Sequence, residues 1–199
     1  MESLMKPLHY VLAIAAVFLV ASTMSPALAR ARTFDLQHSK MTVHVYKQGL
    51  FSFLADNHTV DAPIASGSFD SDAKTVELTV EAAKMRVLDP ALPAQKRETV
   101  QSNMVGAQVL DAARFPTIAF RSTKIEERSF GHWSVVGELT LHGQTHPLDV
   151  QVSSPGAGHY VGSATVRQTE FGITPIRVAG GAVSVRDEVA IEFDIVLSP

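Results

Sequence analysis

The stretch Val135–Val152 decides the fold and reads Val-Val-Gly-Glu-Leu-Thr-Leu-His-Gly-Gln-Thr-His-Pro-Leu-Asp-Val-Gln-Val. Apolar and polar residues alternate in both halves, and successive side chains on a strand point to opposite faces of its sheet. Each half therefore predicts a strand with one apolar and one polar face. Gly143 separates the halves, where a tight turn needs a backbone conformation that larger residues avoid. The stretch predicts an antiparallel hairpin.

The same alternation recurs along most of the chain. It is clear from Lys74 to Ala82 and clearest from Val183 to Leu197, where only Asp187 interrupts the apolar row. Short segments that are polar or contain Gly and Pro separate these stretches, and strands joined by short turns pair antiparallel. We count about eight such strands, so the chain is expected to be all-β.

One region between the strands lacks this alternation. The residues from Ala94 to Ala113 favour a helix by composition, and Val100 and Met104 have the spacing of one buried stripe. Gly106 interrupts the region, so we expect two short helices and not one long one. Whether residues 94–113 act as a lid is left open by the sequence.

Strands with one apolar face bury it either between two sheets or inside a closed barrel. A barrel removes the exposed edges of the sheet, and about eight strands leave room inside for side chains or one small ligand. Both arrangements fit the alternation.

The first 29 residues have the pattern of a secretory signal peptide. The run from Val11 to Val20 is apolar without a break, and Ala27-Leu28-Ala29 fits a cleavage site that leaves Arg30 as the new N-terminus. A retained membrane anchor is the alternative, but the apolar run is shorter than the about 20 residues that a bilayer needs. We therefore expect residues 30–199 to form the mature domain of a periplasmic or secreted protein.

Composition excludes several classes of function. The chain has no cysteine, which removes thiol catalysis and thiolate metal sites, and its core must hold it together without disulfides. Roughly 170 mature residues can build such a core in one domain. The net charge is −3 and no run of basic residues occurs, so nucleic acid is not an expected partner.

Several motifs follow one another along the chain. They include Asp35-x-x-His38-Ser39, Gly67-x-Phe69, Phe115-Pro116-x-Ile118-x-Phe120-x-Ser122, Gly137-x-Leu139-Thr140-Leu141-x-Gly143, Phe171-Gly172-Ile173 and Val185-x-Asp187-x-Val189-x-Ile191. In order and spacing they resemble the YceI-like family of polyisoprenoid-binding periplasmic proteins, over the range from Phe34 to Leu197. The resemblance implies export and a lipocalin-like antiparallel barrel that holds a long prenyl or other lipid chain. It also implies no known catalytic chemistry.

An apolar interior without a convergent set of catalytic side chains favours binding over catalysis. A buried chain gains roughly 0.8 kcal/mol for each methylene that leaves water. Plain core packing is the alternative for every candidate residue, since a small barrel can be filled by its own side chains. The residues that we expect to line a lipid-binding site are Val43, Val45, Phe51, Phe53, Leu78, Val80, Leu110, Ile118, Phe120, Trp133, Leu139, Val150, Ile191, Phe193 and Ile195.

Histidines raise the alternative of a metal site. His142 and His146 flank the hairpin turn and could take zinc or copper with carboxylate partners, and His58 lies in another polar turn. The spacing of His142 and His146 matches none of the helix-borne metal signatures, so we expect solvated turn residues at these two positions and turn hydrogen bonds at His58. His38 and Ser39 are adjacent and would face opposite sides of a strand. They predict hydrogen bonds at a bend and not a nucleophile with its base.

Asp187 is the one acidic residue in the apolar row of the last strand. It could meet a lipid head group or a quinone oxygen inside the barrel. Because an unpaired buried carboxylate is costly, we expect instead an ion pair with Arg167 or Arg186, or a bulge that turns the side chain outward.

The sequence therefore predicts an all-β, antiparallel, eight-stranded lipocalin-like barrel with a short helical insert. We expect an exported, non-catalytic carrier that holds a long-chain isoprenoid or other lipid and needs no other cofactor. The alternatives are a periplasmic partner of redox chemistry that handles an isoprenoid quinone, and a metal-binding stress protein. A membrane or redox partner protein and a homodimer stay open.

Overall fold

The predicted hairpin lies in the middle of the sheet. β8 (His132–Leu141) and β9 (Gln144–Gly156) pair antiparallel, and their turn holds His142 and Gly143 at φ values of 51° and 73°. Positive φ at both central residues is the requirement of the two-residue turn that matches the twist of paired strands. The hairpin prediction is confirmed.

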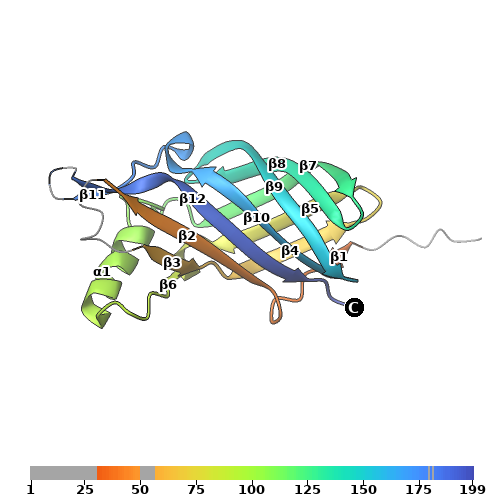
Figure 1. Cartoon of the computed structure of the whole chain (residues 1–199), viewed down its shortest axis with the longest axis horizontal. Coiled ribbons are helices and arrows are strands. Elements are labelled where there is room, and N and C mark those ends of the chain that lie inside the picture. Colours follow the sequence, from red (N-terminus) through yellow and green to blue (C-terminus); the bar gives the residue numbers. More distant parts are fainter. Residues whose placement is uncertain (1–30, 50–56, 179, 181) are drawn as a thin grey trace, which may run out of the picture.

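The computed structural model (Figure 1) describes residues 31–49, 57–178, 180 and 182–199. It places them in one strongly curled antiparallel sheet with a short α-helix at one end. The predicted signal peptide lies outside the described residues.

The other strands extend the hairpin on both sides. They are β1 (Arg32–Thr33), β2 (Lys40–Gln48), β3 (His58–Asp61), β4 (Ile64–Asp70), β5 (Thr75–Glu81), β6 (Arg86–Val87), β7 (Thr117–Ser129), β10 (His159–Arg167), β11 (Arg177–Val178) and β12 (Val183–Val196). Their order across the sheet is β1-β4-β5-β7-β8-β9-β10-β12-β2-β3-β6, and β11 pairs with β12.

The predicted number of eight strands is wrong, since the described part of the chain forms a 12-stranded sheet. Three of the additional strands, β1, β6 and β11, contain 2 residues each. Such strands are too short to show an alternation, and they arise from hydrogen bonds to partners elsewhere in the chain. The single continuous sheet also excludes the two-layer sandwich.

The helical insert is shorter than predicted. α1 (Ala94–Val105) ends at Gly106, whose N–H donates to the Ser102 carbonyl, and turns follow in place of a second helix. Two 3-10 turns, η2 (Ala82–Lys84) and η3 (Gln168–Phe171), connect strands. Among the described residues, no helix combines the length and apolar character that a membrane crossing requires.

The two ends of the described chain are tied together. Arg32 donates two hydrogen bonds to the Ser198 carbonyl, at 2.7 and 3.1 Å. Phe34 forms an isolated antiparallel bridge with Leu197, just beyond β12. The bridge brings the β1 edge of the sheet next to β12, so the sheet curls back on itself.

The Asp35-x-x-His38-Ser39 motif builds the turn between β1 and β2. The Asp35 carboxylate accepts hydrogen bonds from the Gln37 N–H at 3.0 Å and from His38 Nδ1 at 2.7 Å. Ser39 Oγ donates to the Val196 carbonyl and accepts from the Val196 N–H. The predicted hydrogen bonds at a bend are confirmed.

The expected bulge is present at Asp187. The register between β12 and β2 shifts between Val185 and Val189. Thr169, in η3, donates to the Asp187 carboxylate through its N–H at 2.8 Å and its hydroxyl at 2.7 Å. The Asp187 carboxylate therefore has hydrogen-bond donors at the bulge. This confirms the predicted bulge, which allows an acidic residue in the apolar row of the last strand.

Candidate ligand-binding cavity

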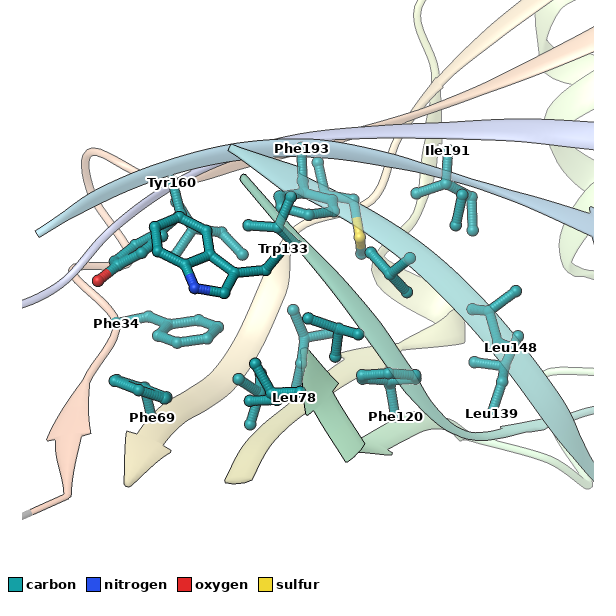
Figure 2. A pocket seen from close by; sticks show the side chains of 18 of the residues that line it. Phe34, Phe69, Leu78, Phe120, Trp133, Leu139, Leu148, Tyr160, Ile191 and Phe193 are labelled. Carbon is teal, nitrogen blue, oxygen red and sulfur yellow. The ribbon is translucent and has the colours of Figure 1, made fainter. Parts of the chain in front are cut away.

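The inward-facing side chains of the curled sheet do not fill its interior. A cavity of about 260 Å³ remains between them (Figure 2). Every residue in its wall is aliphatic or aromatic: Phe34, Met41, Phe69, Val76, Leu78, Val80, Ile118, Phe120, Ile125, Trp133, Val135, Leu139, Leu148, Val150, Val152, Tyr160, Ala164, Ile191, Phe193, Ile195 and Leu197.

A smaller cavity of about 130 Å³ adjoins the larger one on the side of α1, which contributes Met104. Its one polar residue is Gln168, whose amide group donates to the Arg186 carbonyl at 2.7 Å. The rest of its wall is Met41, Val43, Val45, Val60, Ala62, Val80, Met85, Val109, Leu110, Ile118, Leu139, Leu141, Val166, Ile173, Val189 and Ile191. Both cavities therefore offer apolar surface.

Three glycines explain how phenyl rings line the larger cavity without filling it. The pairs are Phe34 over Gly67, Phe120 over Gly137 and Phe193 over Gly162. A methyl group on any of these glycines would overlap the ring that it faces. Each ring thus lies over a glycine of the neighbouring strand, against the wall of the cavity, and leaves the centre open.

Aromatic side chains gather at one end of the larger cavity (Figure 2). The ring of Tyr160 lies 6.0 Å from that of Trp133 and 6.5 Å from that of Phe69, between centroids. The indole N–H and the phenol O–H are the hydrogen-bond donors among the side chains of this wall. An oxygen atom of a bound molecule could be recognised at this end.

The structure gathers the sequence-predicted lining residues around the two cavities. The larger cavity contains Leu78, Val80, Ile118, Phe120, Trp133, Leu139, Val150, Ile191, Phe193 and Ile195 in its wall. Val43, Val45 and Leu110 line the smaller cavity. Phe51 and Phe53 lie outside the described residues. That these residues bind a lipid remains a prediction.

Sequence reasoning missed part of the larger cavity's wall, namely Phe34, Met41, Phe69, Val76, Ile125, Val135, Leu148, Val152, Tyr160, Ala164 and Leu197. The alternation of side chains along a strand could have predicted many of them, since Leu148 and Val152 share the face of Val150. Phe34 has no such signal, because it lies in an isolated bridge and its position depends on Leu197.

The histidines considered as metal ligands make structural contacts. His142 Nδ1 is 3.1 Å from the Phe171 carbonyl, and the ring of His146 meets that of Phe171 edge-on at 5.1 Å. His58 Nδ1 is 2.6 Å from Asp89 Oδ2. All three histidines are half-buried, and His58 lies at the start of β3 and not in the predicted turn. Across the described ranges, no group of three or more His, Cys, Asp or Glu side chains could hold a metal ion.

A broader groove of about 550 Å³ lies on the outer face of β4, β5, β7 and β8. Its wall mixes serine and threonine hydroxyls with the ion pair of Glu77 and Arg121. Ligand sites for small molecules are concave and mostly apolar, so the interior cavities fit that description and this groove does not.

Relatives in sequence cover parts of the chain. A UPF0312 protein of Vibrio cholerae is 32% identical over 95 residues, which are 43% of this chain and 49% of that protein. A UPF0312 protein of Vibrio parahaemolyticus is 26% identical over 136 residues, which are 64% of this chain and 69% of that protein. The match to the Vibrio cholerae relative therefore spans about half of its length.

Two solved structures share the fold. BcnA of Burkholderia cenocepacia has a TM-score of 0.60 at 19% identity, and the superposition covers 83% of this chain and 99% of BcnA. A polyisoprenoid binding domain from Saccharophagus degradans has a TM-score of 0.60 at 11% identity, covering 86% of this chain and 98% of that domain. At such identities the likeness shows the fold alone.

The sequence model of the YceI-like domain family matches residues 33–197 of this chain. This range includes the hairpin, the bulged last strand and all of the residues that line the two cavities. As its motifs predicted, the chain belongs to the YceI-like domain family.

Proposed function

We propose that this protein is an exported, non-catalytic carrier that holds one apolar chain, isoprenoid-like or fatty, inside a lipocalin-like barrel. The observation that carries the proposal is the larger cavity, whose wall is aliphatic and aromatic throughout. The polyisoprenoid binding domain of Saccharophagus degradans, which has the same fold, supports the choice of an isoprenoid. Export through residues 1–29 is part of the proposal.

The energetics favour a chain over a polar metabolite. Each methylene that moves from water into an apolar site gains roughly 0.8 kcal/mol, so about ten buried carbons gain a gross 8 kcal/mol. The cost of ordering the chain reduces this gain, which leaves an affinity of about micromolar or weaker. A polar metabolite would lose its hydrogen bonds to water and find few partners in this wall.

An isoprenoid quinone is the second candidate ligand, and the aromatic end of the larger cavity favours it. Trp133 and Tyr160, whose ring centroids are 6.0 Å apart, offer an N–H and an O–H at this end, which suits a quinone oxygen beside a planar ring. Trp133 is the only tryptophan of the chain. A quinone at this end should quench its fluorescence more strongly than a saturated alcohol with the same chain.

Native mass spectrometry of protein purified from the periplasm tests the proposal. We expect a bound mass of several hundred daltons that organic solvent removes and that identifies the lipid class. Delipidated protein should then take up an added isoprenoid alcohol or fatty acid in a one-to-one ratio. If no bound mass is found and no added chain binds to the folded protein, the carrier function is wrong.

A further inference from the structure

We propose that a layer of five side chains divides the interior of the sheet, and that Met41 within this layer sets the longest chain that the protein binds. The dividing layer consists of Met41, Val80, Ile118, Leu139 and Ile191, which line both the larger and the smaller cavity. The inference rests on the proposed function, because it concerns the length of the bound apolar chain.

The dividing layer crosses the interior. Its members come from β2, β5, β7, β8 and β12, which are distributed along the curled sheet. Val80 and Ile118 are directly opposite each other on paired strands, and Met41 is opposite Phe193. Side chains that touch both cavities stand between them. A chain in the larger cavity therefore meets this layer before it reaches the smaller one.

Met41 is the adaptable member of the layer. Val80, Ile118 and Ile191 are β-branched, and their first side-chain torsion is restricted. Val80 is 1% exposed and Leu139 is 6% exposed, and both belong to buried core clusters. Met41 is partly buried and packs against one of these clusters, and its unbranched side chain has three rotatable bonds. It can be shortened with the least effect on the core.

Because of the sizes of the two cavities, the dividing layer limits the length of the bound chain. The larger cavity, at about 260 Å³, is smaller than the roughly 300–1,000 Å³ of typical ligand pockets. The two cavities together reach that range. A chain held in the larger cavity alone is therefore short. A longer chain could be buried completely only if it also entered the smaller cavity, and the dividing layer blocks this path. Affinity stops rising once the chain reaches Met41.

The test measures affinity against chain length. The probes are linear isoprenoid alcohols of increasing length, and binding is followed by the fluorescence of Trp133, which lines the larger cavity. For the wild-type protein we expect affinity to rise with length and then level off. In Met41→Ala the plateau moves to longer chains, with a gain of about three- to fourfold for each further buried carbon.

Two further variants control the test. Met41→Leu keeps the side-chain volume and should keep the wild-type limit. Met104→Ala enlarges only the smaller cavity, so it should leave affinity unchanged at every length, and it remains informative if Met41→Ala does not fold. An unchanged limit in folded Met41→Ala, or altered long-chain affinity in Met104→Ala, overturns the inference. Failure of the proposed function differs, because the wild-type protein would then bind no chain of any length.

Discussion

Gly67 does not have a positive φ, so its backbone conformation does not require a glycine. The close contact with the ring of Phe34 explains why a glycine is present in the cavity wall. The nearest atoms that a Cβ would meet all belong to the ring of Phe34. At Gly137 and Gly162 a Cβ would also meet a backbone carbonyl oxygen. Gly67 is therefore the position where the packing of a ring over a glycine can be tested with the fewest other changes.

Gly67→Ala is expected to lower the free energy of unfolding by about 1–3 kcal/mol, since the added methyl group forces the ring of Phe34 out of its position. Urea or thermal unfolding measures the loss. Phe34→Leu in the same chain removes part of the overlap. The double variant should therefore lose less than the two single variants combined, and simple additivity would contradict the contact.

Asp35 provides a pH-dependent contact. The hydrogen bond from His38 holds the pKa of Asp35 below its ordinary value. A carboxyl group whose pKa is lowered by folding stabilises the fold above its unfolded pKa, and this contribution is lost as pH falls through the lowered pKa. In His38→Ala the pKa of Asp35 should rise, as measured by NMR titration. His159→Ala removes the partner of Asp194 instead and should leave the pKa of Asp35 unchanged.

At the scale of elements, β7 shows how polarity can be misread. The segment 126–129 is rich in charge, a composition typical of turns, yet β7 continues through it to Ser129. Lys124 and Arg128 both pair with Glu126, at 2.6 and 3.0 Å, because residues two apart share a face of the strand. Ile125 points the other way and lines the larger cavity. A strand with ion pairs on its outer face therefore resembles a turn in composition.

α1 depends on few attachments. No residue of this helix is buried, and Gln101 makes two hydrogen bonds to the segment around β6. Its side-chain oxygen accepts from the Val87 N–H at 2.8 Å, and its amide group donates to the Met85 carbonyl at 2.9 Å. These bonds and the apolar contacts of Val100 and Met104 hold the helix beside the smaller cavity.

Gln101→Ala should loosen α1 without unfolding the sheet. Loss of the two hydrogen bonds is expected to cost about 1–3 kcal/mol locally, since the Val87 N–H is left without its acceptor. Hydrogen exchange should become faster in α1 and β6 and stay slow in β8 and β9. Gln95→Ala, at an exposed position on the same helix, is the control. Equal exchange in both variants would mean that Gln101 does not anchor the helix.

At the scale of the whole molecule, a ligand that binds only the folded state must stabilise it. At about 100 times its Kd, a chain adds roughly 2.7 kcal/mol, which for a protein of this size raises the Tm by roughly 5–10 °C. Ala164→Phe places a ring in the larger cavity and should remove most of this rise. Thr165→Phe, on the outer face of the same strand, should retain it. A full rise in Ala164→Phe would exclude the larger cavity as the site.

The alternation of residues in the sequence determined the hairpin, the long strands and the apolar character of the interior. These properties are local, because the backbone of a strand points alternate side chains to opposite faces. This alternation was sufficient to predict most of the lining residues, such as Leu78 on β5 and Ile195 on β12.

Only the tertiary structure decided the number of strands, the open interior and its division by the layer around Met41. The two-residue strands exist through hydrogen bonds to distant partners. Phe193 lies back over Gly162 because β10 and β12 are neighbours, and such pairs leave the centre open. Whether the inward-facing apolar side chains fill the interior or leave a cavity depends on contacts between residues far apart in the chain. The local alternation of residues does not predict these contacts.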